Sequence, residues 1–271
     1  MHQPIVNIAL RAAQSAGKII EQAFTRVDTV PVESKGQNDY VTAVDRAAEA
    51  AIIDTIHKAY PNHAILGEES GRIEGRRGDS DTLWIIDPLD GTTNFIHGFP
   101  HFAVSIAVMV RDRLEHAVVY DPMRKEEFTA SRGRGAQLND RRIRVSERKS
   151  LEGALIGTGF PFRKEQMPHL EAYLAMFRDV AQVTAGIRRP GSAALDLAYV
   201  AAGRMDGFWE SGLQPWDTAA GCLLVNEAGG LVSDFAGGEK YLEKGHIVGG
   251  NPKVLKALLQ TIAPHVPAGW K

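Results

Sequence analysis

The sequence predicts a protein of helices and sheets in two subdomains, α+β in the first half and α/β in the second. Two observations support this fold class. The spacing of apolar residues changes from helical to strand-like near residue 60, and strand-like and helical segments alternate beyond residue 150. The chain has 271 residues, of which 44% are hydrophobic and 24% charged, so a sizeable core can form. We therefore expect an N-terminal subdomain over 1–150 and a C-terminal one over 151–271.

The N-terminal subdomain should begin with two helices and continue as a sheet. Apolar residues recur at spacings of three and four over 7–25 and 45–60, and Pro61 would end the second helix. Short β-branched or aromatic segments separated by turn residues follow, at 64–66, 83–86, 104–110, 115–120 and 127–131. They predict one largely antiparallel sheet. The glycine-rich stretch 131–139 reads as a hairpin turn, because no helix follows it as a nucleotide loop would require.

The second half alternates between the two kinds of element, as an α/β unit does. Strand-like segments cover 154–160, 206–210, 231–234 and 246–250. Helical patterns run over about 170–181, 192–202 and 216–228, and a last helix starts at Pro252. The single cysteine, Cys222, lies on an apolar helical pattern and is expected to be a core thiol.

Charge and hydropathy exclude several kinds of partner. The net charge is −2, so neither DNA nor an anionic membrane is expected as the main partner. The start of the chain lacks a basic segment followed by a continuous apolar run, and no stretch of about 18 uncharged apolar residues occurs. We expect a cytoplasmic protein without a membrane partner.

The stretch WIIDPLDGTTNF at 84–95 places Asp87 and Asp90 just after a buried strand. Pro88 is expected to form a tight turn that brings both carboxylates to one side, and Gly91 with the threonines after it can open a helix whose free N–H groups bind an anion. Carboxylates this close repel unless a hard cation lies between them. Mg²⁺ fits, since it takes a few carboxylates and leaves positions for water and phosphate oxygens.

Three more carboxylates stand at the ends of predicted elements: Glu68 in GEES, Asp45 in VTAVD and Asp217 in QPWDTAAG. Each also has an ordinary structural explanation. Asp45 and Asp217 could be helix N-caps, Glu68 a solvated turn residue, and DPLDG a plain β-turn. Residue types and spacing alone leave these alternatives open.

The combination resembles the inositol monophosphatase family over nearly the whole chain. The family pattern has a GEES-like glutamate, W-x-x-D-P-x-D-G-T-x-N-F, and a W-D before a helix rich in Ala and Gly; residues 67–70, 84–95 and 216–221 match it. The segments SRGRGAQLN, GTGFPFR and GIRRPGSAALDLAYVAAGRMDGFWE further resemble the bacterial SuhB branch of that family. The resemblance implies a layered αβαβα sandwich, a homodimer and a lithium-sensitive, Mg²⁺-dependent phosphatase for myo-inositol monophosphate and similar polyol phosphates.

The resemblance also implies a metal site with two or three Mg²⁺. Glu68, Asp87 and the Leu89 carbonyl would hold one ion, and Asp87, Asp90 and Asp217 a second, with Asp87 bridging; a third, weaker ion would lie near Glu68. A metal-activated water would attack phosphorus in line.

Thr92, Asp45 and Glu68 are the catalytic residues that this resemblance implies, with the Thr92 hydroxyl relaying the proton of the water to Asp45. The substrate would be bound by Glu68, Asp90, Gly91, Thr92, Arg188, Gly191, Ser192, Ala193, Glu210 and Asp217, and Glu210 would accept hydrogen bonds from a hydroxyl of the alcohol. Lys35 and Glu69 are further candidates.

Other functions stay open beside hydrolysis of inositol phosphates. Related family members act on fructose bisphosphate, histidinol phosphate or a 3′-phosphonucleotide. SuhB-type proteins are also associated with the Nus antitermination machinery on ribosomal RNA transcripts, which brings Nus-type transcription factors and RNA polymerase into question as partners. Residues 132–149 hold seven basic and two acidic residues, a strip that an RNA or an acidic protein could contact.

Overall fold

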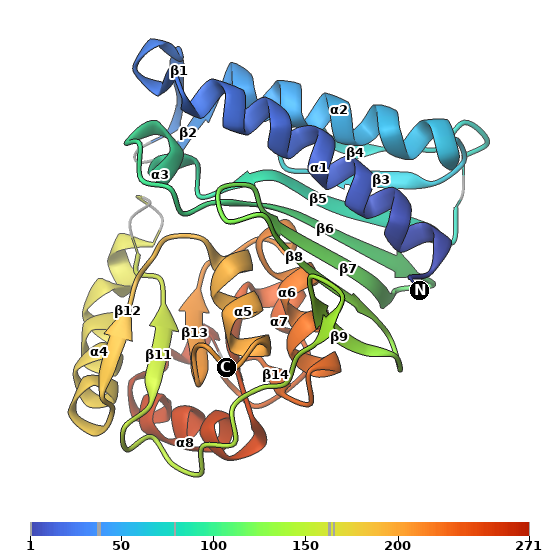
Figure 1. Cartoon of the computed structure of the whole chain (residues 1–271). Coiled ribbons are helices and arrows are strands. Elements are labelled where there is room, and N and C mark those ends of the chain that lie inside the picture. Colours follow the sequence, from blue (N-terminus) through green and yellow to red (C-terminus); the bar gives the residue numbers. More distant parts are fainter. Residues whose placement is uncertain (1, 37–38, 79, 162–163, 165, 271) are drawn as a thin grey trace.

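A computed structural model describes residues 2–36, 39–78, 80–161, 164 and 166–270, with the side chains of 34–41 also left out. Figure 1 shows five layers: a helix pair, a large sheet, a central helix pair, a smaller sheet and an outer helix pair. The predicted αβαβα sandwich is therefore confirmed. The helices of the three helical layers are α1 (Pro4–Phe24) and α2 (Ala43–Ala59), α5 (Ala193–Ala201) and α6 (Pro215–Glu227), and α4 (Leu170–Val183) and α8 (Pro252–Ile262).

The eight-stranded sheet contains the strand at whose end the acidic motif lies. Its strands in spatial order are β10 (Arg141–Arg142), β9 (Gly135–Leu138), β8 (Glu126–Ser131), β7 (Arg113–Asp121), β6 (Ala103–Val110), β5 (Thr82–Asp90), β3 (Ala64–Gly67) and β4 (Gly71–Ile73). All neighbours pair antiparallel except β3 and β5, which run parallel. This parallel pair ends at one edge, so the residues after β3 meet those at the end of β5.

The five-stranded sheet forms the other side of the sandwich. In spatial order it contains β12 (Gly186–Arg188), β11 (Leu155–Thr158), β13 (Gly207–Ser211), β15 (His246–Gly250) and β14 (Leu231–Ser233). β11 runs parallel to β12 and β13, whereas β15 runs antiparallel to β13 and β14. Two short helices, α3 (Thr92–Ile96) and α7 (Tyr241–Lys244), and the hairpin of β1 (Val32–Gly36) and β2 (Asp39–Thr42) complete the fold.

The longer predicted elements are confirmed within a few residues, and the hairpin predicted for 131–139 joins β8 to β9. The short strands β1, β2, β4, β9, β10 and β12 were not predicted, because they are brief and show no clear alternation. Among the described residues, no helix is long and apolar enough to span a membrane.

One apolar cluster joins the two halves of the chain. It brings Val119 and Phe128 of the large sheet together with Phe208 of the small sheet and Leu223 of α6. Cys222 lies in the same cluster and is fully buried. Burial raises the pKa of its thiol, as expected for a thiol in the core. Residue 150 falls between β10 and β11, the end of one sheet and the start of the other, and we keep the division into two subdomains as a proposal.

Candidate active site

A bulge at the end of β5 brings Asp87 and Asp90 to the same side of the sheet. Asp87 lies opposite Ser105 of β6 and Asp90 opposite Ala103, so two residues of β5 face one of β6. Residues three apart on a regular strand point to opposite faces, and the extra residue of a bulge reverses that relation. The tight turn expected at Pro88 is thus wrong: Pro88 lies within the bulge, where a missing N–H is tolerated.

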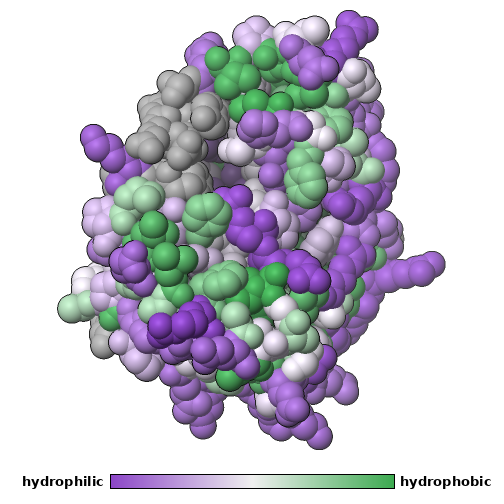
Figure 2. Space-filling view, turned by 90° about the vertical axis from the view of Figure 1, so that its left-hand side faces the viewer, coloured by the Kyte–Doolittle hydropathy of each residue, from purple (hydrophilic) through white to green (hydrophobic). Residues whose placement is uncertain are grey.

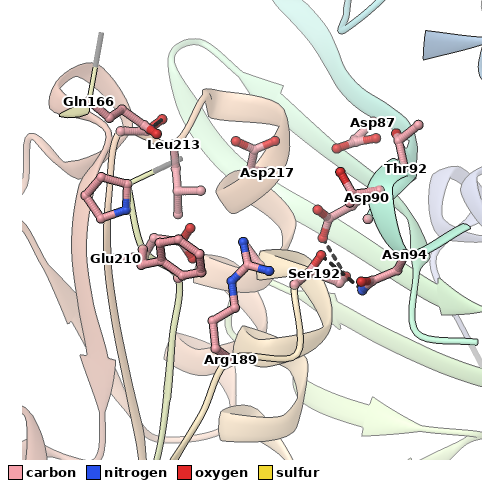
Figure 3. Close-up of a pocket in the computed structure, with 18 of the residues that line it drawn as sticks. Asp87, Asp90, Thr92, Asn94, Gln166, Arg189, Ser192, Glu210, Leu213 and Asp217 are labelled. Carbon is pink, nitrogen blue, oxygen red and sulfur yellow. Dashed lines mark hydrogen bonds between the residues drawn. The ribbon is translucent and has the colours of Figure 1, made fainter. Parts of the chain in front are cut away.

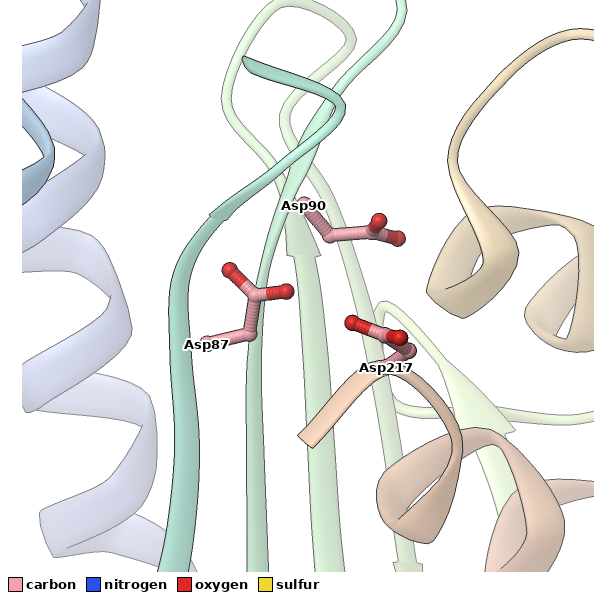
Figure 4. A group of neighbouring side chains, drawn as sticks. All are labelled: Asp87, Asp90 and Asp217. Atoms are coloured by element: carbon pink, nitrogen blue, oxygen red, sulfur yellow. The ribbon is translucent and has the colours of Figure 1, made fainter. Parts of the chain in front are cut away.

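Asp217 completes a three-carboxylate cluster from the central helix layer. Oxygen atoms of Asp87, Asp90 and Asp217 all lie within 4.8 Å of one another, and Figure 4 shows the three side chains converging from β5 and the start of α6. Asp217 is the third residue of α6, and its Oδ2 accepts the N–H of Gln214 at 2.7 Å. It closes a capping box and is not the N-cap that its position suggested.

The charges of the cluster indicate a cation site. Burial, then Glu68, then the other two aspartates raise the pKa of Asp87 well above its ordinary value. Burial is also the main cause that raises the pKa of Asp90 to about 6. Glu68 follows β3 and is anchored by its N–H, which donates to the Ile86 carbonyl at 3.2 Å. The donors are all oxygen atoms and repel one another, a set that suits a hard divalent cation.

Thr92 and Asp45 lie beside the cluster in hydrogen-bond contact. The Thr92 hydroxyl is 3.0 Å from Asp45 Oδ1 and 3.0 Å from the Leu89 carbonyl oxygen. Asp45 Oδ2 accepts from the Thr42 hydroxyl at 2.5 Å and from the Thr42 N–H at 2.9 Å. Asp45 is the third residue of α2 and Thr42 is the N-cap, so the alternative of Asp45 as N-cap does not hold. One carboxylate thus serves both helix capping and the Thr92 hydroxyl.

These two duties can be separated by substitution. Asp45→Asn should lower the hydrolytic rate by about 10² or more, because an amide accepts no proton, and should cost about 1 kcal/mol of stability through the weakened capping box. Thr42→Ala is the matched control, since it weakens the same cap and leaves Asp45 and Thr92 in contact. Phosphate-release rates and urea melts measure both effects. Equal activity in the two variants would show that Asp45 only caps the helix and takes no part in hydrolysis.

The acidic cluster lines one end of a cavity of about 550 Å³. Figure 3 shows Asp87, Asp90 and Asp217 at that end, with Glu210 and Arg189 on the opposite wall. The opposite wall comes from β13 and the segment before α5. The guanidinium of Arg189 lies over the Phe160 ring, 4.5 Å from its centroid.

Gly91 and Asn94 lie where the loops that form the cavity come together. Gly91, the N-cap of α3, has φ +101°, and a Cβ there would lie 3.0 Å from the His101 carbonyl and 3.3 Å from the Gly191 carbonyl. Glycine is required by both the left-handed backbone and this close approach. The Asn94 amide donates to the carbonyls of His101 at 2.7 Å and Pro190 at 2.8 Å.

Most residues proposed from the sequence meet at this cavity. Its lining includes Glu68, Asp87, Leu89, Asp90, Gly91, Thr92, Gly191, Ser192, Ala193, Glu210 and Asp217. Ser192 donates its hydroxyl to Asp90 Oδ2 at 2.7 Å, and the same oxygen accepts the Ala194 N–H at 2.7 Å, so the start of α5 orients Asp90.

The outcome differs for three further candidates. Arg188 is exposed at the end of β12 and is not among the lining residues, whereas its neighbour Arg189 is; a contact between Arg188 and the substrate stays a prediction. Glu69 does not line the cavity either, and its N–H donates to Glu49 Oε2 at 2.9 Å. Lys35 lies in β1, and its side chain is outside the described part of the chain.

Sequence reasoning missed other lining residues, among them Arg189, Asn94, Phe160 and Gln166. Asn94 stood inside the 84–95 motif and Phe160 inside GTGFPFR, so the signal was present for both. Gln166 carried no signal that separates it from other polar loop residues.

Comparison with known proteins places this geometry in a family. Residues 1–268 match the model of the inositol monophosphatase family. A Nus factor SuhB from Pseudomonas aeruginosa is 66% identical over 99% of both chains. Among solved structures, the extragenic suppressor protein suhB from Bartonella henselae has TM-score 0.93 and 46% identity over 97% of this chain and 100% of that one. An inositol monophosphatase from Anabaena has TM-score 0.85 and 38% identity over 97% of both chains. The chain belongs to the inositol monophosphatase family.

Proposed function

We propose that the protein is a Mg²⁺-dependent phosphomonoesterase that hydrolyses myo-inositol monophosphate and similar polyol phosphates. The carrying observation is the placement of three mutually repelling carboxylates at one end of a cavity whose other wall holds Glu210 and Arg189. The first end suits a cation with a phosphate, and the second suits an alcohol rich in hydroxyl groups. Membership of the inositol monophosphatase family supports the same reaction class.

The residues divide the work of holding the ions. Glu68, Asp87 and the Leu89 carbonyl would hold one Mg²⁺, Asp87, Asp90 and Asp217 would hold a second, and a third would lie near Glu68. Bound Mg²⁺ supplies Lewis acidity that offsets phosphate charge and makes water a better nucleophile. The bulge in β5 and the N–H and hydroxyl groups at the start of α5 orient the aspartates before any ion binds.

Proton transfer and phosphate orientation belong to the start of α3. The Thr92 hydroxyl, in contact with Asp45, would accept a proton from the attacking water while its own passes to Asp45. Burial raises the pKa of Asp45, which favours its acting as the proton acceptor. The N–H groups of Gly91 and Thr92 would hold the phosphate in line for attack.

The alcohol would be selected on the opposite wall. Glu210 would accept a hydrogen bond from a hydroxyl of the polyol, and Gly191 and Ala193 would leave room for the polyol ring. A substrate that lacks this hydroxyl forms one hydrogen bond fewer with this wall, at a cost of about 1 to 3 kcal/mol.

Phosphate release tests the function directly. Inositol 1-phosphate, fructose 1,6-bisphosphate, histidinol phosphate and a 3′-phosphonucleotide are offered with Mg²⁺, with EDTA, and with Mg²⁺ plus tens of millimolar Li⁺. We expect the inositol ester to be preferred, EDTA to abolish release, and Li⁺ to inhibit, because Li⁺ has a similar radius to Mg²⁺ but half its charge. Preference for the nucleotide would overturn the substrate assignment, and indifference to Li⁺ would count against the metal arrangement.

A homodimer is part of the proposal. The face at the left of Figure 1, turned toward the viewer in Figure 2, carries green apolar areas among the hydrophilic residues. On α4, Leu174 is 47% exposed, and Phe177 and Val183 are exposed as well. Apolar side chains gathered on one helix are typical of a contact between subunits. The mass in solution, measured by light scattering, distinguishes a dimer from a monomer.

A second candidate function is binding to the Nus-type transcription machinery. The observation in its favour is the strip 132–149, in which Arg134, Arg141, Arg142, Arg144 and Lys149 are exposed, together with the name of the Pseudomonas relative. Such binding should survive Asp87→Asn and weaken steeply with salt, whereas hydrolysis should vanish in that variant.

A further inference from the structure

Glu49 is a buried acid that the proposed mechanism does not use. It lies on α2 four residues after Asp45, and only 3% of Glu49 and 1% of Asp45 are exposed. Residues four apart on a helix share one face, so both acids lie on the side of α2 that packs against the large sheet (Figure 1). Asp45 contacts Thr92 at the start of α3. Glu49 lies one turn further along, beside the turn that carries Glu68.

A hydrogen bond attaches the turn between β3 and β4 to Glu49. The Glu69 N–H donates to Glu49 Oε2 at 2.9 Å. The preceding N–H, that of Glu68, donates to the carbonyl of Ile86 at 3.2 Å, and Ile86 directly precedes Asp87 on β5. The backbone on both sides of the Glu68 Cα is therefore held, on one side by the strand that contains Asp87 and on the other by a carboxylate of α2.

Gly67 shows how closely the Glu49 carboxylate approaches this turn. A Cβ at Gly67 would lie 2.5 Å from Glu49 Oε2 and 2.9 Å from Glu49 Cδ, with Ser70 Oγ at 2.8 Å. The carboxylate occupies the space that any larger side chain at this position would need, so glycine is required here by close packing. A packing contact and a hydrogen bond thus place Glu49 against the same turn.

The surroundings of Glu49 argue against a role in packing alone. Its neighbours on the buried face of α2, Ala48 and Ile52, are apolar and fully buried. Burying a carboxylate beside them is unfavourable unless the carboxylate makes strong hydrogen bonds. An apolar side chain would suit this face of the helix better, but it would remove the acceptor that the Glu69 N–H uses.

We propose that Glu49 is a positioning residue for the metal site: its carboxylate holds the turn between β3 and β4 so that the Glu68 side chain faces Asp87 before any cation binds. The inference rests on the proposed function, in which Glu68 and Asp87 hold one Mg²⁺ together. A ligand that is fixed in advance loses less conformational freedom when the ion binds, and this raises the affinity. One face of α2 then aligns both the proton acceptor Asp45 and the turn of a metal ligand.

The affinity for Mg²⁺ without substrate, measured by titration calorimetry, tests this role. Glu49→Met keeps the approximate volume and removes the acceptor, whereas Glu49→Gln keeps an acceptor oxygen in its amide. We expect the Kd for Mg²⁺ to rise about tenfold in Glu49→Met and to stay within about threefold of wild type in Glu49→Gln. At saturating Mg²⁺, kcat for inositol 1-phosphate should stay within about twofold in both, because Glu49 is placed to touch neither substrate nor ion.

Ile52→Val is the matched control, because it loosens the same buried face of α2 without touching the turn. It should leave the Kd for Mg²⁺ unchanged. Hydrogen exchange of the metal-free proteins adds a readout that is independent of activity. A peptide covering residues 66–71 should exchange about tenfold faster in Glu49→Met than in wild type, and at the wild-type rate in Ile52→Val.

Other results would overturn the inference. An unchanged Mg²⁺ affinity in Glu49→Met, or equal losses in Glu49→Met and Ile52→Val, would show that the turn needs no such support. If Glu49→Gln loses as much affinity as Glu49→Met, the site uses the charge of Glu49 and not its hydrogen bond. A wild type that binds Mg²⁺ but releases no phosphate would end the proposed function, while the affinities would still decide the role of Glu49. A wild type that binds no Mg²⁺ would end both.

Discussion

Asp87→Asn should reduce hydrolysis by about 10³ or more without destabilising the metal-free fold. The side chain belongs to both proposed ion sites, so the loss of one charge weakens both ions together. Asparagine keeps the Oδ1 atom that accepts the Leu89 N–H at 2.9 Å, so this hydrogen bond within the bulge is retained. Removing one of several mutually repelling carboxylates should leave the metal-free melting temperature equal to that of wild type or higher.

Asp121 offers a matched control for the expected direction of the stability change in Asp87→Asn. It is also a buried aspartate followed by proline at a strand end, and its Oδ1 accepts the Met123 N–H at 2.9 Å. Unlike Asp87, it is paired with a cation, since Arg124 donates to its Oδ2 at 2.9 Å. Asp121→Asn should therefore lower stability by about 1 to 3 kcal/mol with or without Mg²⁺. The melting temperatures of the metal-stripped proteins test this contrast, and a drop of several degrees in Asp87→Asn would show that Asp87 mainly stabilises the bulge.

The sequence was informative where a long pattern or a dense motif constrained the chain. The helix expected over 7–25 runs over Pro4–Phe24, because a buried stripe at helical spacing leaves little choice. The acids of the 84–95 motif meet as expected, but through a bulge in place of a turn: proline is compatible with both, and only the pairing with β6 distinguishes them.

Arg188 shows why site residues on short strands are hard to predict. Arg189 follows the last residue of β12, both arginines are exposed, and only Arg189 is among the lining residues, so the sequence alone does not distinguish the two neighbours. β12 has three residues and no alternation to fix its register.

Stabilisation of the protein by Mg²⁺ should be small at pH 5 and large at pH 7.5. In the metal-free protein, burial and neighbouring acids raise the pKa of Asp90 to about 6 and raise that of Asp87 well above its ordinary value. Between about pH 4 and pH 6 the folded state therefore binds more protons than the unfolded state, and stability falls as the pH rises through this range. Asp90 alone contributes on the order of 2 kcal/mol. Bound Mg²⁺ removes this penalty by pairing the ionised carboxylates, whereas at pH 5 it must displace their protons.

The quantity to measure is the melting temperature with Mg²⁺ minus that of metal-stripped protein at each pH. We expect this difference to grow by roughly 5 °C from pH 5 to pH 7.5, and Asp90→Asn to reduce the growth. The pH-dependent contributions of groups outside the site cancel in this difference. Asp234, for example, has a pKa lowered by backbone N–H groups and Lys244, and it stabilises the protein equally with and without Mg²⁺. A difference that stays constant with pH would mean that the cluster is already ionised without a cation. Its carboxylates would then be held apart by other contacts, and the reason for placing Mg²⁺ between them would be lost.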